Sequence, residues 1–172
     1  AVLGGKTVFV KGIPAKGYRV VKTVRDTNTI KITEKSIENK FFRMKFDKTG
    51  ALSEIYDKKN RREVLKKGGR GNVLTVYEDF PRKYDNWEVS NYYSEKFWEI
   101  SDVQSVTPVC DGVRAGLEIK RNFQRSEIVQ RIWLYEDIAR IDFDNKIDWK
   151  EDHLLVKAAF PTDINADKAT YE

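Results

Sequence analysis

The sequence contains a single cysteine, Cys110, and a single histidine, His153, among its 172 residues. One cysteine cannot close an internal disulfide or supply a multi-cysteine zinc or iron–sulfur site. One histidine excludes an HExxH pair and any two-histidine metal site built from this chain alone. No apolar run approaches the roughly 20 residues that a membrane-spanning helix needs. Most familiar catalytic machinery is therefore excluded.

The two chain ends also carry few recognisable features. The chain begins at Ala1, and its first five residues lack the charged, apolar and small-residue order of a signal peptide. It stops at Glu172 without a tail-like composition. We therefore expect both ends to be cuts within a longer polypeptide. The lone cysteine fits a reducing compartment, so we expect a cytoplasmic protein.

What the sequence does contain is enough apolar material for a packed core. Hydrophobic residues make up 40% and aromatic residues 12% of the chain, so general disorder is excluded. The net charge of +5 is concentrated in residues 58–70, which hold seven cations and one carboxylate. This stretch has no aromatic residue for base stacking, so we favour a solvated hairpin end and loop. A polyanion-binding patch is the alternative.

Hydrophobic residues alternate with polar ones along most of the chain, which is typical of β-strands. Phe42, Met44 and Phe46 share one face, residues 47–50 form a turn, and residues 51–56 return as the second strand of a hairpin. The same alternation continues in residues 113–123, 128–135 and 141–147, and residues 154–160 form a last apolar run.

The pattern predicts an all-β fold, an antiparallel β-sandwich. The helical period never holds for three turns, so no amphipathic helix is expected. Residues 1–28 end in a polar turn, and we assign them to leading strands or to the end of a preceding small β-domain. Residues 29–172 are assigned to the main sandwich.

Residues 77–99 carry the features that best suit a binding site. They hold eight of the chain's 21 aromatic residues and six carboxylates against three cations. The alternation stops after Tyr77, and a long aromatic loop is usually functional or anchored. Flat rings such as Tyr84 and Trp87 can cover the apolar face of a sugar while Asp79 and Asp85 accept its hydroxyls. The alternative is that several of these rings only fasten the loop to the sandwich.

Other candidate residues are weaker. Asp142 and Asp144 share a strand face about 6.5–7 Å apart, a separation close to that of glycosidase carboxylates. Alternating acids on a strand are, however, usually its solvated face. His153 has neither an orienting acid nor a nucleophile that we can assign, so a structural role is favoured. Cys110 lies in what reads as a turn, residues 107–112, without a base to activate it.

A series of segments, in order, resembles the C-terminal region of glycoside hydrolase family 38, the α-mannosidases. The similarity covers nearly the whole chain and includes an aspartate–proline segment followed by an aspartate–tryptophan–acid segment. The resembling stretches are residues 14–18, 37–47, 50–52, 55–57, 71–81, 84–88, 140–144, 147–149 and 153–161. Two positions depart from the family pattern: Asn86 stands where a small residue is common, and Glu88 where aspartate is more common.

The resemblance implies a galactose-mutarotase-like supersandwich, shortened at its C-terminus. It implies that the parent enzyme is a retaining, zinc-dependent α-mannosidase whose catalytic barrel, nucleophile and metal ligands lie outside this chain. No catalytic residue and no metal or other cofactor is then expected here. Asp79, Tyr84, Asp85 and Trp87 are the residues implied to reach toward the sugar. The implied partners are the N-terminal catalytic domain of the same polypeptide and a mannose-containing oligosaccharide, with no nucleic acid and no membrane.

Three functions therefore compete. The first is a non-catalytic sandwich of an α-mannosidase, inactive when isolated. The second is an autonomous carbohydrate-binding module that uses the aromatic loop. The third is a scaffolding domain that binds a polyanion through residues 58–70. We favour the first, because half of a cleft lacks the enclosure that tight binding needs.

Overall fold

The computed structural model of the chain describes residues 2, 3, 6, 7, 10, 13–20, 29–84 and 87–168. Within these residues there are fourteen β-strands, one 3-10 turn at Tyr93–Glu95 and no α-helix. The strands are β1 (Val2–Leu3), β2 (Lys6–Thr7), β3 (Lys31–Thr33), β4 (Ser36–Glu38), β5 (Phe42–Phe46), β6 (Leu52–Asp57), β7 (Arg62–Glu63), β8 (Val73–Glu78), β9 (Phe97–Glu99), β10 (Asp102–Cys110), β11 (Arg114–Phe123), β12 (Ser126–Tyr135), β13 (Ile141–Asp148) and β14 (Leu154–Ala159). The predicted all-β fold is confirmed.

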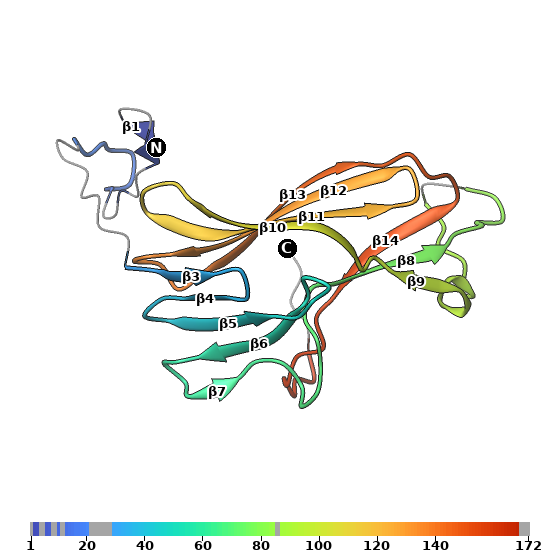
Figure 1. Cartoon of the computed structure of the whole chain (residues 1–172), viewed down its shortest axis with the longest axis horizontal. Helices are drawn as coiled ribbons and strands as arrows, with labels where there is room; N and C mark the ends of the chain where they lie inside the picture. The colour runs from blue at the N-terminus through green and yellow to red at the C-terminus, as the bar shows by residue number, and fades with distance from the viewer. Residues whose placement is uncertain are drawn as a thin grey trace.

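The strands form antiparallel sheets, and one long sheet organises the rest. It has the order β10-β11-β12-β13, while a five-stranded sheet has the order β3-β4-β5-β6-β7 and a three-stranded sheet the order β14-β8-β9. In Figure 1 the long sheet runs across the top, with the five-stranded sheet under one end and the three-stranded sheet under the other. β1 and β2 form a separate two-stranded hairpin. The predicted antiparallel sandwich is confirmed, with its second layer divided between two sheets.

The β5–β6 hairpin shows how the sequence specifies these strands. Met44 and Phe46 point into the core from alternate positions of β5, as the period of two predicts. The turn closes because Oδ1 of Asp47 accepts hydrogen bonds from the backbone N–H groups of Thr49 and Ala51, at 2.8 and 3.1 Å. Gly50 has a φ of 73°, which glycine adopts without strain. The predicted hairpin is confirmed.

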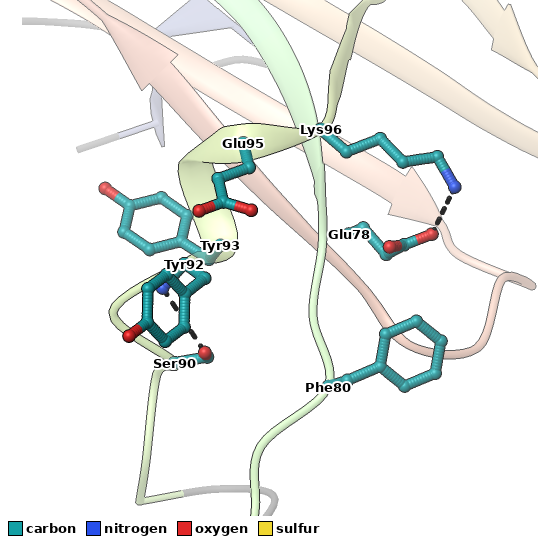
Figure 2. Close-up of a pocket in the computed structure, with 7 residues that line it drawn as sticks. All are labelled: Glu78, Phe80, Ser90, Tyr92, Tyr93, Glu95 and Lys96. Carbon is teal, nitrogen blue, oxygen red and sulfur yellow. Dashed lines mark hydrogen bonds and ion pairs between the residues drawn. The ribbon is translucent and has the colours of Figure 1, made fainter.

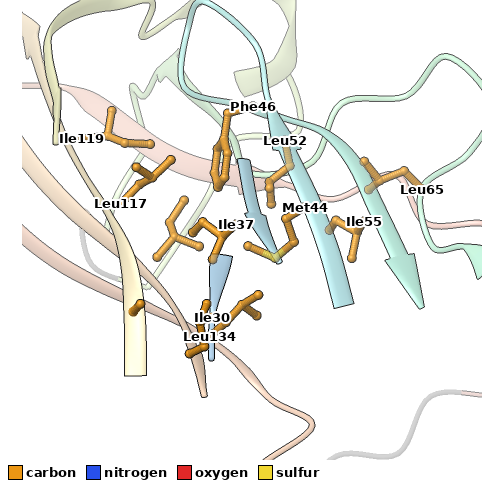
Figure 3. Packing of buried hydrophobic residues seen from close by; sticks show 12 residues of the cluster. Ile30, Ile37, Met44, Phe46, Leu52, Ile55, Leu65, Leu117, Ile119 and Leu134 are labelled. Atoms are coloured by element: carbon orange, nitrogen blue, oxygen red, sulfur yellow. The ribbon is translucent and has the colours of Figure 1, made fainter. Parts of the chain in front are cut away.

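The main core lies between the five-stranded sheet and one end of the long sheet (Figure 3). Alternate residues of β11 and β12 face inward here. The buried members of this core are Ile30, Ile37, Met44, Phe46, Leu52, Ile55, Leu65, Ala115, Leu117, Ile119, Ile132 and Leu134. Their side chains are removed from water by both layers, so this packing supplies most of the hydrophobic stabilisation.

A second, smaller core lies between the three-stranded sheet and the other end of the long sheet. Its buried members are Leu74 and Val76 of β8, Ile100, and Ile128 of β12. The rings of Phe123 and Trp149 stack beside it with centroids 5.9 Å apart. Because β12 contributes to both cores, the long sheet fixes the two smaller sheets relative to each other.

A buried arginine occupies the junction of the layers. Arg121 lies on the inward face of β11 and is 1% exposed. Its guanidinium donates to the carbonyl oxygens of Thr49 at 3.1 Å and Gly50 at 2.8 Å, and to Oε1 of Gln130 at 3.2 Å. Gln130 exchanges hydrogen bonds with the buried side chain of Asn72. Burial lowers the pKa of Arg121 to about 10, so the guanidinium remains charged at neutral pH.

A second arginine holds the same turn from outside. Arg70 donates to Asp47 at 2.6 Å, to Thr49 at 2.5 Å and to both carboxylate oxygens of Glu99 at 2.9 and 2.7 Å. Its hydrogen bonds lower the pKa of Glu99 below 4.5, against the opposing effect of partial burial. The β5–β6 turn is therefore fastened both to the long sheet and to β9.

The outer face of the long sheet carries two buried aromatic side chains, Trp133 and Tyr135. Trp133 is 4% exposed, and the guanidinium of Arg114 lies 4.2 Å from its ring centroid. Gly116 lies opposite Trp133 in the β11–β12 register and leaves room for the indole. Tyr135 is covered in a similar way by the guanidinium of Arg140. Arginine side chains thus cover rings that the alternation places outside the core.

The structure places Cys110 differently from the prediction and does not describe the predicted domain boundary after residue 28. Cys110 was expected in a turn, but it is the last residue of β10, paired with Ala115. That prediction is wrong because Pro108 reads as a turn residue, whereas β10 is an edge strand that tolerates proline. The boundary expected between residues 28 and 29 follows residues 21–28, which lie outside the described residues, so it stays a prediction.

Candidate functional site

Part of the aromatic segment is fastened to the three-stranded sheet. β9 returns alongside β8, with Tyr77 opposite Phe97. The Tyr77 ring contacts Tyr93 edge-on at 5.2 Å and Phe97 at 5.9 Å between centroids. Nζ of Lys157 in β14 lies 3.7 Å from the Tyr93 centroid. For Tyr77 and Tyr93 the structure supports the alternative interpretation, that they fasten the segment to the sandwich, whereas Phe97 touches Tyr77 but stays 60% exposed.

Other aromatic side chains of the segment are directed to solvent. Phe80, Tyr84, Trp87 and Tyr92 are each more than half exposed, and Trp87 reaches 91%. Phe97 is also more than half exposed. Large aromatic side chains contribute strongly to stability when buried, so five exposed rings in one short segment are unusual for a closed surface. Exposed apolar groups gathered in this way typically mark a surface that meets a ligand or another domain.

A turn brings two of the predicted residues together. The backbone N–H groups of Trp87 and Glu88 donate to the carbonyl oxygen of Tyr84, at 3.2 and 3.0 Å. The amino group of Lys83 lies 5.3 Å from the centroid of the Tyr84 ring. Tyr84 and Trp87 therefore project from one turn. Asp85, which was predicted beside them, lies outside the described residues, as does Asn86.

Asp79 lies apart from that turn, against the start of β14. Its backbone N–H donates to the carbonyl oxygen of His153 at 2.8 Å. With Pro81, Asp152, His153 and Leu154 it lines a shallow depression of about 450 Å³. Its Oδ1 atom is buried and has no hydrogen-bond partner in the described part of the chain. A buried carboxylate oxygen without a donor is costly, and it suits a site that receives a hydroxyl group.

Figure 2 shows a second depression, lined in part by the chain neighbours of Asp79. Its volume is about 430 Å³, and it is lined by Glu78, Phe80, Ser90, Tyr92, Tyr93, Glu95 and Lys96. Within it, Nζ of Lys96 donates to Oε1 of Glu78 at 2.5 Å. Sequence reasoning did not select these residues. The hydrophobic alternation stops after Tyr77, so the sequence carried no periodic signal for Glu78 and Phe80, whose shared side follows from the extended backbone after β8.

Residues 37–172 match the model of the "Glycosyl hydrolases family 38 C-terminal domain". The chain belongs to this family. Alpha-mannosidase 2C1 of Homo sapiens and of Mus musculus are each 27% identical to it over 142 residues, and Alpha-mannosidase G of Dictyostelium discoideum is 26% identical over 144 residues. The resemblance inferred from the sequence is thereby confirmed.

The chain spans only a small share of the length of the relatives that it matches. The human and mouse matches cover 80% of this chain but 14% of each relative, and the Dictyostelium match covers 79% and 13%. The relatives are α-mannosidases, which are hydrolases. This chain corresponds to the family's C-terminal domain and spans about one seventh of the length of these relatives.

The described residues of this family 38 domain offer little to a metal ion. Over residues 29–84 and 87–168 and the shorter described stretches before them, no group of three or more His, Cys, Asp and Glu side chains could hold one. Asp79, Asp152 and His153 do line one depression, but they do not form such a group. In the same residues no helix is long and apolar enough to cross a membrane.

Two of the weaker candidates from the sequence, Asp142 and His153, contact other side chains of the family 38 domain. Asp142 accepts hydrogen bonds from Tyr135 and Arg140, so its carboxylate helps to hold the outer face of the long sheet. Asp144 is exposed. The His153 ring stacks on Phe80 with centroids 4.8 Å apart. The structural interpretation of Asp142 is supported, whereas His153 lies at the candidate site after all.

The basic segment of the family 38 domain is partly neutralised. Lys58 donates to Glu38 at 2.6 Å, and this hydrogen bond lowers the pKa of the Glu38 carboxyl. Arg70 is paired with Asp47 and Glu99, as described above. Two of the seven cations therefore serve the packing of the sandwich, which favours the solvated-loop interpretation over a polyanion patch.

Proposed function

We propose that this domain forms a non-catalytic wall of the sugar cleft in a retaining α-mannosidase that hydrolyses terminal α-mannosides. The family match and the α-mannosidase relatives support the parent activity. The observation that carries the domain's own role is the exposure of Trp87, 91%, on a turn that also presents Tyr84. An indole exposed to water gains stabilisation once a sugar face or a neighbouring domain covers it.

The residues of this chain bind and orient; they do not break the glycosidic bond. Tyr84 and Trp87 cover the apolar C–H face of the sugar. The Asp79 carboxylate, which lines the first depression, accepts a sugar hydroxyl. Asp85 contributes a second acceptor if it follows the family pattern. Enclosure of the sugar excludes water and orients the scissile bond for the catalytic domain.

Catalysis and metal binding are assigned to the rest of the polypeptide. Retaining hydrolysis needs two carboxyl groups roughly 5–5.5 Å apart. The resemblance assigns the nucleophile to a catalytic barrel that also holds zinc, which acts there as a Lewis acid. The isolated chain is therefore proposed to be inactive, with the N-terminal catalytic domain as its partner and a mannose oligosaccharide as its ligand. The cytoplasmic location is proposed on the lone Cys110 alone.

The test uses the full-length polypeptide that contains this domain, assayed with an aryl α-mannoside and zinc. NMR of the first product should show α-mannose, as retention requires. Trp87→Ala should lower kcat/KM about tenfold with little change in the melting temperature, because the side chain contacts almost nothing in this domain. Tyr18→Ala removes another highly exposed ring, outside the aromatic segment, and is the matched control.

Two results would contradict the proposal. One is a full-length protein without α-mannosidase activity. The other is a Trp87→Ala enzyme that behaves like Tyr18→Ala. Zinc-dependent hydrolysis by the isolated chain would contradict the assignment of catalysis to the rest of the polypeptide.

An autonomous carbohydrate-binding module remains a second candidate, because the exposed rings lie beside two open depressions. Titration of the isolated chain with mannose or short α-mannosides, followed by tryptophan fluorescence, separates the two functions. Tight binding that Trp87→Ala abolishes supports the module. Weak or absent binding supports the cleft wall, since half of a cleft lacks enclosure.

A further inference from the structure

We propose that the depression lined by Glu78, Phe80, Tyr92 and Glu95 is a second sugar subsite, which binds the neutral hexose unit next to the terminal mannose (Figure 2). This inference rests on the proposed function, because it assigns a neighbouring unit of the same substrate. It concerns residues that neither the family match nor the sequence pattern singled out.

The position of this depression follows from the extended chain after β8. Successive side chains of an extended segment point to opposite sides, so Glu78 and Phe80 face one way and Asp79 and Pro81 the other. Each pair lines its own depression. The Phe80 ring lines the second depression and the His153 ring lines the first. The two rings stack with centroids 4.8 Å apart and planes at 22°. The two depressions therefore share this stacked pair as a common wall, which suits neighbouring units of one oligosaccharide.

The far wall of the subsite comes from the 3-10 turn. The backbone N–H of Glu95 donates to the carbonyl oxygen of Tyr92 at 3.0 Å. Side chains three residues apart on a 3-10 turn lie nearly one above the other, so Tyr92 and Glu95 face the depression together. The neighbouring Tyr93 is held by Tyr77 and Lys157, which fixes the turn. An exposed phenol ring and a carboxylate are thus presented in a defined arrangement.

The charges of the subsite favour a neutral, polyhydroxylated ligand. Glu78 and Lys96 form an ion pair, so their charges offset each other. The Glu95 carboxylate forms no hydrogen bond or ion pair with the other six lining residues drawn in Figure 2. It can therefore accept two hydroxyl groups, and it repels a ligand that carries an acid group. The volume of about 430 Å³ lies within the usual range for small-molecule sites.

The experiment compares two substrates of the full-length polypeptide. α-Mannosyl fluoride has no second ring, whereas an α-linked mannobiose extends into the proposed subsite. Tyr92→Ala should lower kcat/KM for the mannobiose about tenfold, and its loss with the fluoride should be several times smaller. Tyr18→Ala is the matched control for exposed tyrosine and should leave the ratio of the two substrates unchanged.

Charge discrimination gives a readout that a structural role would not change. A disaccharide whose second ring is a uronic acid should be a poor substrate of the native enzyme. Glu95→Gln keeps the side-chain shape and should raise kcat/KM for this acid relative to mannobiose about tenfold. Glu34→Gln, at an exposed position outside the aromatic segment, is the control and should not change that ratio.

The outcomes distinguish this inference from the proposed function. Equal losses of kcat/KM on both substrates with Tyr92→Ala overturn the subsite and indicate that a neighbouring domain covers the depression. An unchanged ratio of kcat/KM for the uronic acid and the mannobiose with Glu95→Gln also overturns it. A native enzyme that hydrolyses no α-mannoside overturns the proposed function itself.

Discussion

Replacing Gly50 by alanine tests how the sheets are held together. Gly50 has a φ of 73°, and a Cβ at this position would lie 2.4 Å from Nη2 of Arg121 and 3.0 Å from Cγ2 of Ile119. The end of an arginine side chain is normally flexible, but Arg121 is 1% exposed and donates to the carbonyl oxygens of Thr49 and Gly50. The substitution therefore strains the backbone and also displaces a buried cation.

The expected magnitude follows from these two effects. A non-glycine residue in the left-handed region costs about 1–2 kcal/mol. Loss of a hydrogen bond from a charged donor costs about 1.5–3 kcal/mol when the group stays buried. We expect the free energy of unfolding to fall by about 3–5 kcal/mol, a large part of the roughly 5–15 kcal/mol typical of a domain.

Urea unfolding followed by the emission of the four tryptophans measures this loss. Gly68→Ala is the matched control, because Gly68 also has a φ of 73° but a Cβ there would meet nothing within 4 Å. It should cost only the backbone strain, about 1–2 kcal/mol. In an Arg121→Met background the cost of Gly50→Ala should fall toward that value. Equal losses for the two glycine variants in the native background would refute the role assigned to Arg121.

Three further predictions concern stability and its pH dependence. Gly116→Ala should lower the free energy of unfolding by about 3 kcal/mol, as read from the urea midpoint, because its Cβ would lie 2.2 Å from the backbone oxygen of Ile132; a loss below that of Gly68→Ala would contradict the packing described. The pKa of Glu99 is lowered below 4.5 by Arg70, so this contribution to stability is present above about pH 4.5 and is lost as the pH falls through the folded-state pKa. Arg70→Gln should therefore be less stable than the native chain at pH 6, and the difference in unfolding free energy should shrink below pH 4.5; a constant difference would argue against the pair. Asp79→Asn should leave the domain equally or more stable in thermal melts, because Oδ1 has no donor within the described residues, while it lowers kcat/KM of the full-length enzyme; a clear loss of stability would indicate a structural role.

The strands and their inward faces were predictable because hydrophobic burial imposes the period of two on the sequence. Met44 and Phe46 in β5, and Leu117 and Ile119 in β11, occupy the positions that this period predicts. The β5–β6 turn was predictable for a local reason, since Asp47 and Gly50 satisfy it within the hairpin itself. Cys110 was misplaced because proline marks both turns and edge strands.

The candidate site was only partly predictable. The density of aromatic residues identified the segment, but it did not separate Trp87, which is exposed, from Tyr93, which is fastened beneath Lys157. Nor could spacing show that Phe80 stacks on His153, because β8 and β14 are distant in the sequence and adjacent only in the sheet. A structural role was favoured for the lone histidine because no orienting acid or nucleophile could be assigned to it, and its contact with Phe80 was not predicted.

The order of segments along the chain identified its family, because each segment matches a local pattern whose residues are close together in the sequence. The alternation determined its all-β class for the same reason. Which charges are buried, which rings are exposed and which side chains share a depression was decided only in three dimensions. Arg121 reads as one more polar residue on a strand until Thr49, Gly50 and Gln130 surround it. Contacts between distant strands depend on how sheets pack against each other, and no local pattern encodes them.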